Sequence, residues 1–176
     1  LRQTTPYNCY VSGTIQDSMI DIMDKATEAA LTMKLGGGIG YDFSTLRPNG
    51  ANIVSLDSSA SGPLSFMDVF DSVCGTVSSA GHRRGAQMAV LRVDHPDIED
   101  YVHAKNNHNK YTNFNTSVGI TDEFMEAVLN DTSLDLRFEG RVYKTIRAKA
   151  LWDAIMRSTW DWAEPGILFI DRINQK

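Results

Sequence analysis

A cluster of glycines at 36–40 directly follows a long amphipathic segment, and this junction restricts the fold more than any other feature. The cluster consists of Gly36, Gly37, Gly38 and Gly40. Glycines in such number do not continue a helix, because each costs roughly 0.5–1 kcal/mol relative to alanine in a helix interior. The residues at 39–43 are typical of a buried strand. The sequence therefore predicts a helix that ends at the glycines and returns at once into a strand.

Strand-like and helical patterns alternate along the rest of the chain. Further strands are expected at 8–11, 88–93, 113–120, 134–138 and 167–170. Helices are expected at 17–34, 64–79, 121–129 and 148–163, with a short one beginning at His95-Pro96-Asp97. This alternation indicates an α/β domain with mainly parallel strands.

Apolar residues at helical spacing predict which helix faces are buried. In the first helix the predicted face is Met19, Ile20, Met23, Ala26, Ala30 and Met33. In the second it is Phe66, Met67, Phe70, Val73, Cys74 and Val77. In the last helix, core or interface positions are expected at Leu151, Trp152, Ile155, Trp160 and Trp162.

Composition argues against several classes of protein. The net charge of −5 gives no basic surface for nucleic acid. No apolar run reaches the length of a membrane span, and the start has no signal-peptide pattern. Two cysteines form no disulfide framework, and the four histidines have no cysteine at ligand spacing, so we expect a cytoplasmic protein without a metal site. We also expect the chain to be a piece of a longer protein, because it begins without Met and ends just after an apolar strand.

Two glycine- and arginine-containing segments are candidates for binding a phosphorylated nucleotide. The first is the glycine cluster with Arg47, whose planar fork suits phosphate and which lies just past a strand end, where α/β folds bind ligands. The second is Gly81, His82, Arg83, Arg84 and Gly85. Ordinary alternatives are a helix C-cap with a tight strand entry for the glycines, a solvated loop arginine, and a plain helix–strand connection. The spacing matches neither a Walker loop nor a dinucleotide fingerprint.

Cys9 and Asp17 each allow two interpretations. A strand cysteine is usually a small core residue, and a redox role for Cys9 needs a second cysteine nearby. Cys74 is a poor partner, because it lies on the apolar stripe of the second helix. Asp17 is placed to act as the N-cap of the first helix, or its carboxylate accepts a hydrogen bond from a ribose hydroxyl.

The order of these motifs resembles that of the large, catalytic subunit of ribonucleotide reductases. The motifs are Asn8-Cys9-Tyr10-Val11, Asp17-Ser18, the glycine strand, Leu46-Arg47-Pro48-Asn49-Gly50-Ala51, Ser79-Ala80-Gly81-His82-Arg83-Arg84-Gly85-Ala86-Gln87-Met88, His95-Pro96-Asp97-Ile98 and Asn113-Phe114-Asn115. The residues of these motifs are most similar to those of the adenosylcobalamin-dependent class. That similarity rests on residues 36–44, on 83–88, and on Ala163-Glu164-Pro165-Gly166 with 169–174.

The resemblance implies the ten-stranded α/β barrel of the family, of which residues 1–176 would form the first, five-stranded half. It implies that a cysteine thiyl radical removes the ribose 3′ hydrogen and that a cysteine pair then supplies the reducing electrons. Cys9 matches the first cysteine of that pair, and Asn8, Cys9 and Gly38 match substrate-binding positions. The partner cysteine, the radical cysteine and the catalytic glutamate would lie beyond Lys176, so the chain alone is expected to be inactive.

The resemblance also implies regulation by a deoxynucleoside triphosphate effector. Asp17, Ser18, Met19 and Arg47 match the effector site, with Arg47 on the phosphates. Residues 47–61 correspond to one specificity loop and 78–85 to a second, lying between effector and substrate, in which Arg83, or failing that Arg84, senses the substrate base. Helices 17–34 and 64–79 would pair across a homodimer.

The other partners that the resemblance implies are a ribonucleotide substrate, a thioredoxin- or glutaredoxin-type reductant, and adenosylcobalamin held mainly outside this chain. Two alternatives stay open. One is the same reaction with a radical drawn from a separate metal-containing subunit, and the other is a nucleotide-binding module without catalysis.

Overall fold

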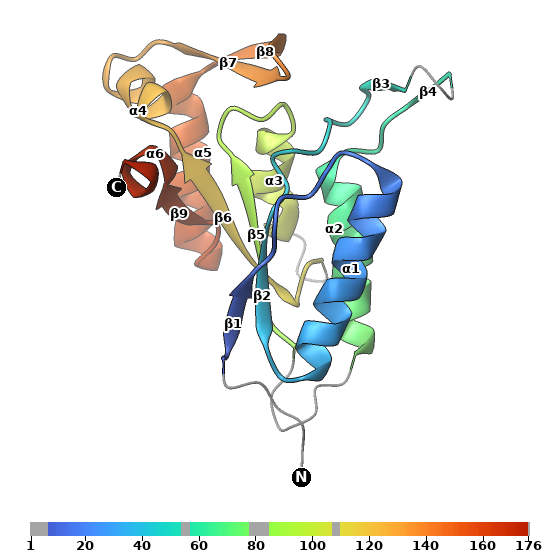
Figure 1. Cartoon of the computed structure of the whole chain (residues 1–176). Helices are drawn as coiled ribbons and strands as arrows, with labels where there is room; N and C mark the ends of the chain where they lie inside the picture. Colours follow the sequence, from blue (N-terminus) through green and yellow to red (C-terminus); the bar gives the residue numbers. More distant parts are fainter. Residues whose placement is uncertain (1–6, 54–56, 78–84, 107–109, 176) are drawn as a thin grey trace. The chain divides into compact units, whose positions relative to one another are not determined.

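A five-stranded sheet, with strands in the order β1-β2-β5-β6-β9, forms the frame of the fold (Figure 1). The computed structural model describes residues 7–53, 57–77, 85–106 and 110–175. The strands of the sheet are β1 (Cys9–Val11), β2 (Gly38–Asp42), β5 (Gln87–Arg92), β6 (Phe114–Ile120) and β9 (Gly166–Phe169). β1 pairs with β2, and β6 with β9, in parallel. Neighbouring strands are separated in sequence by at least one helix, so the predicted α/β class is confirmed.

Six helices and two hairpins complete the described part of the chain. The helices are α1 (Met19–Lys34), α2 (Pro63–Thr76), α3 (Ile98–His103), α4 (Asp122–Leu129), α5 (Ala148–Trp162) and α6 (Ile170–Asn174), with a 3-10 turn at Ala104–Asn106. The antiparallel hairpins are β3 (Asn52–Ile53) with β4 (Ser58–Ser59), and β7 (Ser133–Phe138) with β8 (Arg141–Arg147). β3, β4, β8 and α6 were not predicted. Most of β8 is exposed, so it lacks the apolar alternation that marks a half-buried strand.

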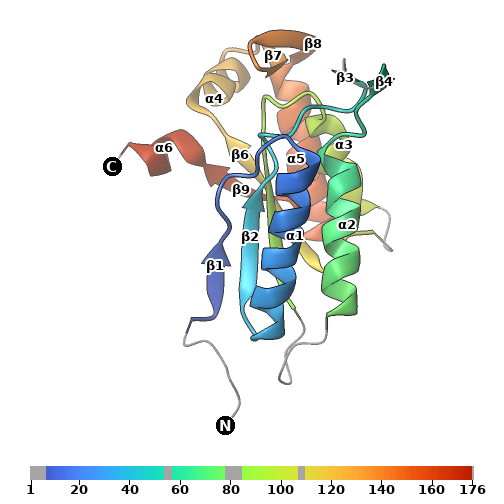
Figure 2. The same cartoon turned by 45° about the vertical axis from the view of Figure 1, so that its right-hand side comes forward.

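Contacts divide the chain into two compact units, Leu1–Ala89 with Tyr111–Asn115, and Val90–Lys110 with Thr116–Lys176. In the first unit α1 and α2 lie side by side (Figures 1 and 2). Its core is an aromatic cluster in which Phe70 packs edge-on to Tyr41 and Phe43, with ring centroids 4.8 and 5.4 Å away. The Tyr41 hydroxyl donates to Oε1 of Gln87 at 3.0 Å, and burial raises the pKa of Tyr41.

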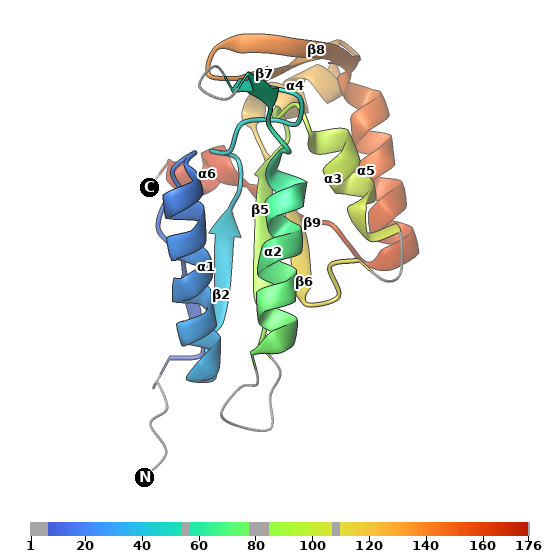
Figure 3. The same ribbon diagram turned by 90° about the vertical axis from the view of Figure 1, so that its right-hand side faces the viewer.

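In the second unit α3 packs beside α5 (Figure 3). The Ser158 hydroxyl of α5 donates to the carbonyl of Val102 in α3 at 3.0 Å. Oε2 of Glu164 accepts hydrogen bonds from the amide and hydroxyl of Thr116 and forms an ion pair with Lys105 at 2.8 Å. These contacts join the turn after α5 to the beginning of β6.

Two predicted burial patterns hold only in part. In α1 the buried residues are Ile22, Ala26, Ala29 and Met33, whereas Met19 and Ile20 are 60% and 78% exposed. The helix is apolar on two faces, so the helical periodicity of apolar residues alone did not show which face is buried. In α5 the core positions Leu151 and Ile155 are confirmed. Trp160 is 86% exposed, so of the two predicted environments, core or interface, the core is excluded for it. None of the helices in the described ranges has the length and apolar character needed to cross a membrane.

Candidate functional site

A cavity of about 300 Å³ in the first unit brings together all four residues predicted to bind an effector. Those four are Asp17, Ser18, Met19 and Arg47. The remaining lining residues are Ile22, Ile53, Ser59, Ala60, Ser61 and Phe66. The wall thus combines a fixed cation, hydroxyls and an apolar surface, a mixture typical of small-molecule sites.

The start of α1 explains how Asp17 becomes available to the cavity. Ser18, not Asp17, is the N-cap, because its hydroxyl accepts from the amide of Asp21 at 3.3 Å. The prediction of Asp17 as the cap is therefore wrong. One residue earlier in the chain, the Asp17 carboxylate lies outside the helix and contacts Arg47 instead.

Asp17 and Arg47 form a partly buried ion pair. Nε of Arg47 donates to Oδ2 of Asp17 at 2.6 Å, and the Arg47 amide donates to Oδ1 at 3.3 Å. Nη2 of Arg47 also donates to the main-chain carbonyl of Asp17 at 3.3 Å. The side chains are 35% exposed for Arg47 and 24% exposed for Asp17, so both remain open to a ligand. Arg47 is therefore not the freely solvated loop arginine of the ordinary alternative.

Three further hydrogen bonds hold the segments of the cavity wall together. The Thr45 hydroxyl donates to the carbonyl of Ile15 at 2.6 Å, which ties the segment after β2 to the segment before α1. The amide of Gly50 donates to the carbonyl of Ala60, and the amide of Ala60 donates to the carbonyl of Ala51, which holds Gly50 and Ala51 close to the start of α2. Most of the cavity wall therefore belongs to segments that are fixed by their own hydrogen bonds.

The sequence did not single out Ile22 or Phe66 as site residues. Phe66 was predicted as a core position of the second helix. Ile22 was not on the predicted face of the first helix, although it is 2% exposed. Ile53, Ser59, Ala60 and Ser61 fall within the predicted first specificity loop but have no chemistry that marks them individually. Only the fold shows that these side chains share one wall.

A second group of predicted residues meets at the beginning of β1 and β2. Cys9 is the register partner of Gly38, and the amide of Gly38 donates to the carbonyl of Asn8 at 2.7 Å. Cys9 is exposed. A Cβ on Gly38 would lie 3.3 Å from the carbonyl oxygen of Ala86 and 3.6 Å from that of Asn8, so glycine allows close approach of the backbones here. The three predicted substrate-binding residues are therefore neighbours.

The glycine cluster has a structural role as well. Gly36 has a φ of +89° and follows the last turn of α1, and its amide donates to the carbonyl of Met33 at 2.9 Å. The alternative of a helix end with a tight strand entry is thus confirmed for Gly36. Gly38 lies beside Cys9, so the two interpretations hold for different members of one cluster.

Of the second glycine and arginine segment, Gly81, His82, Arg83 and Arg84 lie outside the described residues. Gly85 is described and half-buried. A Cβ there would lie 2.9 Å from Sδ of Met33 and 3.0 Å from Sγ of Cys74. The end of the segment therefore packs directly on the C-terminal parts of α1 and α2.

Cys74 is a core residue, as predicted. It is 5% exposed, and burial, with a smaller contribution from the Asp71 carboxylate, raises the pKa of its thiol. In the described ranges no group of three or more His, Cys, Asp or Glu side chains is arranged to hold a metal ion. Of the two thiols in the chain, Cys9 is the one available for chemistry.

Comparison with known families agrees with this geometry. Residues 7–176 match the family model described as ribonucleotide reductase, barrel domain. The chain belongs to the ribonucleotide reductase family. The family prediction and the fold class that it implies are thereby confirmed.

Relatives in this family cover nearly the whole chain. A vitamin B12-dependent ribonucleoside-diphosphate reductase of Thermoplasma acidophilum is 42% identical over 171 residues, 96% of this chain and 22% of the relative. One of Mycobacterium tuberculosis is 42% identical over 170 residues, 95% of this chain and 24% of the relative. The chain thus spans about a quarter or less of the length of these ribonucleotide reductases.

A solved ribonucleotide reductase shares the fold. The class Id alpha subunit of Actinobacillus ureae superimposes with a TM-score of 0.78 at 23% identity, covering 99% of this chain and 29% of that one. This likeness supports the arrangement of strands and helices in the chain.

The different environments of the two cysteines predict different reactivities. In the folded chain, iodoacetamide should label Cys9 and leave Cys74 unmodified, with a rate difference on the order of tenfold or more, because the thiolate is the nucleophile and Cys74 is buried with a raised pKa. Mass spectrometry of digested samples measures both rates. In urea both cysteines should react alike. Equal labelling in the folded chain would contradict the structure.

Proposed function

We propose that this chain is the N-terminal part of the catalytic barrel of a ribonucleotide reductase that converts ribonucleotides to deoxyribonucleotides. The observation that supports this best is the pairing of Cys9 with Gly38 beside Asn8, since these are the residues predicted to contact substrate. The named relatives support a vitamin B12-dependent enzyme acting on ribonucleoside diphosphates. We place the enzyme in the cytoplasm, with a thioredoxin- or glutaredoxin-type protein as its reductant.

In this proposal Cys9 is one of two thiols that reduce the substrate. Replacing a 2′-hydroxyl by hydrogen releases water and requires two electrons and two protons, which two thiols supply as they form a disulfide. The second thiol, the radical cysteine and the catalytic glutamate belong to segments that follow this chain. The exposed position of Cys9 on an edge strand supports access by both the substrate and the second thiol.

Adenosylcobalamin supplies the initial radical in this class of enzyme. The described residues do not fit it: the cavity of about 300 Å³ is lined by one arginine, one aspartate, three serines and a few apolar side chains, and the β1–β2 edge is a narrow backbone contact. We therefore assign cobalamin binding to segments outside this chain.

We further propose that the cavity at the start of α1 binds a deoxynucleoside triphosphate effector. Arg47 would bind the phosphates, Asp17 would accept a hydrogen bond from the sugar, and Ser18 would accept or donate one. Ile22, Ile53 and Phe66 offer an apolar wall to the base. A cation, hydroxyls and an apolar surface are the groups that such a ligand requires.

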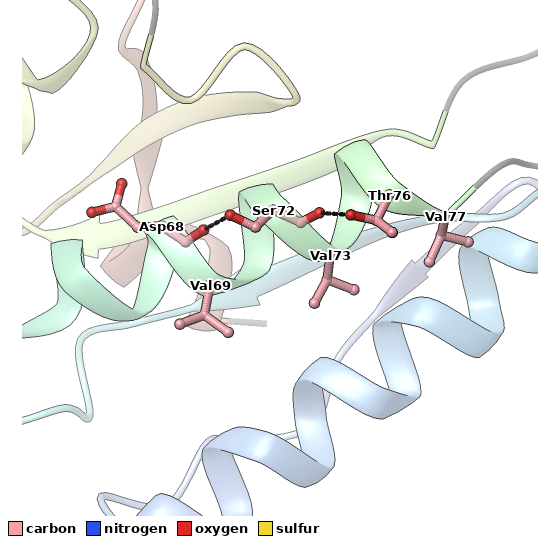
Figure 4. A pocket seen from close by; sticks show the side chains of 6 residues that line it. All are labelled: Asp68, Val69, Ser72, Val73, Thr76 and Val77. Atoms are coloured by element: carbon pink, nitrogen blue, oxygen red, sulfur yellow. Dashed lines mark hydrogen bonds between the residues drawn. The ribbon is translucent and has the colours of Figure 1, made fainter.

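We propose that α1 and α2 form a homodimer interface. Ile20 and Leu31 of α1 are 78% and 58% exposed. Along α2 a shallow groove is lined by Asp68, Val69, Ser72, Val73, Thr76 and Val77, and Figure 4 shows the three valines pointing to the same side. Exposed apolar stripes on adjacent helices are characteristic of protein interfaces.

The dimer also offers a route between effector and substrate. α1 has 16 residues, so it places the cavity about 24 Å from the Gly36–Gly38 end in the same chain. A two-fold axis perpendicular to α1 would set the helices of two protomers antiparallel. The cavity of one protomer would then face the Gly85 end of its partner, where the predicted second specificity loop ends.

The reaction is tested in the complete enzyme with Cys9→Ser. Wild type should turn over repeatedly with adenosylcobalamin and a dithiol. The variant should give at most about one turnover or an abortive product, because the thiol pair that supplies the two electrons is broken. Product per enzyme is counted by chromatography, and Cys74→Ala serves as the matched control that keeps turning over. Sustained turnover by Cys9→Ser would refute the redox role, and an absolute need for a second subunit would refute the cobalamin class.

Arg47→Ala tests the effector site. Loss of a charge-assisted contact to phosphate should weaken deoxynucleoside triphosphate binding roughly 10- to 100-fold and reduce the dependence of substrate choice on effector. Calorimetry on the complete enzyme measures the affinity, and Arg92→Ala removes a comparable ion pair in the second unit as a control. Unchanged affinity for the effector would show that the phosphates bind elsewhere.

Leu31→Asp tests the dimer. Placing a charge on the exposed stripe of α1 should raise the dimer dissociation constant about tenfold or more, because two copies of the substitution meet in a two-fold interface. Sedimentation equilibrium of the complete enzyme measures this constant. Val142→Asp, at a 48% exposed position of β8, should leave it unchanged. A dimer of undiminished stability would exclude this face as the interface.

A further inference from the structure

Asp17 contacts Arg47 through one side of the guanidinium only. Nε donates to Oδ2 of Asp17 and Nη2 donates to the Asp17 carbonyl, while Nη1 makes no hydrogen bond to any other described residue. A guanidinium has two edges that each bind an acceptor pair, one formed by Nε with one terminal nitrogen and one formed by both terminal nitrogens. Asp17 occupies the first edge, and the second edge, with Nη1, can still bind a ligand.

The same carboxylate also fixes the backbone of Arg47. Oδ1 of Asp17 accepts from the Arg47 amide at 3.3 Å. A single aspartate, with its side chain and its carbonyl, thus receives three hydrogen bonds from one arginine that lies 30 positions later in the chain. Both residues line the cavity. An arginine held in this way loses less conformational freedom when an anion binds.

We propose that Asp17 is a positioning residue for Arg47, holding its Nε edge so that the edge with Nη1 is left for the effector phosphates. This inference rests on the proposed effector function of the cavity. It adds a role to the sugar contact assigned above, since a carboxylate has lone pairs enough to accept from both an arginine and a hydroxyl.

Two other arrangements predict different results. If Asp17 only contacts the sugar, its removal matters only for ligands that have the 3′-hydroxyl. If the ion pair instead competes with phosphate, removing the Asp17 charge should tighten binding. We expect positioning to outweigh repulsion, because both side chains are partly exposed and solvent screens the repulsion between Asp17 and the phosphates.

The test compares dATP with 2′,3′-dideoxy-ATP, which lacks the 3′-hydroxyl, by calorimetry on the complete enzyme. Asp17→Asn should weaken binding of the dideoxy compound about tenfold, because the charge-assisted hydrogen bond to Nε is lost. In an Arg47→Ala background, Asp17→Asn should have no further effect on that compound. Asp94→Asn disrupts a comparable pair with Arg92, in which the aspartate is 21% exposed, and should leave both affinities unchanged.

Each outcome decides between the arrangements. Unchanged or tighter binding of the dideoxy compound by Asp17→Asn overturns the positioning role. Equal weakening with and without Arg47 also overturns it, since that would make Asp17 a general structural support of the cavity. If wild type binds neither nucleotide, the effector function itself fails, which is a distinct result from a wild-type site that binds but ignores Asp17→Asn.

Discussion

The parallel pairing of β1 with β2 is the constraint on which both candidate sites depend. Cys9 lies opposite Gly38 in this pair, and α1 is the connection between the two strands. Because a parallel connection must return to the starting edge, the chain has two turns, one at each end of α1. The turn before α1 contains Asp17 and the turn after it contains Gly36, so the proposed effector cavity and Cys9 lie at opposite ends of one β-α-β unit.

This arrangement gives α1 a part in both sites. Its first residues, with Ile22 in the next turn, line the cavity, and Met33 in its last turn packs where a side chain at Gly85 would have to fit. A packed helix transmits a displacement better than a loop does, because close-packed interiors have few voids to absorb it. The same helix also exposes Ile20 and Leu31, so any movement of α1 would reach the proposed dimer face. Allosteric coupling requires an element that two sites both influence, and we propose α1 for that role.

The sequence predicted the elements of this unit well and their local contacts less well. The glycine cluster and the periodicity located α1 and β2, because both signals depend only on near neighbours along the chain. The N-cap was misassigned by one residue, because Asp17 and Ser18 both have side chains that cap helices well. Asp17 instead contacts Arg47, which lies 30 residues away in the sequence. The buried face of α1 was misjudged for a related reason, since only packing distinguishes Ile22 from Ile20. Long-range partners decide such cases, and propensity does not contain them.

The shift of the cap from Asp17 to Ser18 has a functional consequence. A carboxylate that caps a helix uses its oxygens on main-chain amides, and it then has fewer lone pairs for other donors. With the Ser18 hydroxyl in that position, Asp17 is free to hold an arginine and still has capacity for a ligand hydroxyl. Capping the helix and contacting Arg47 are therefore divided between Ser18 and Asp17. Ser18 begins the helix, and Asp17 holds Arg47, the cation that we propose binds phosphate.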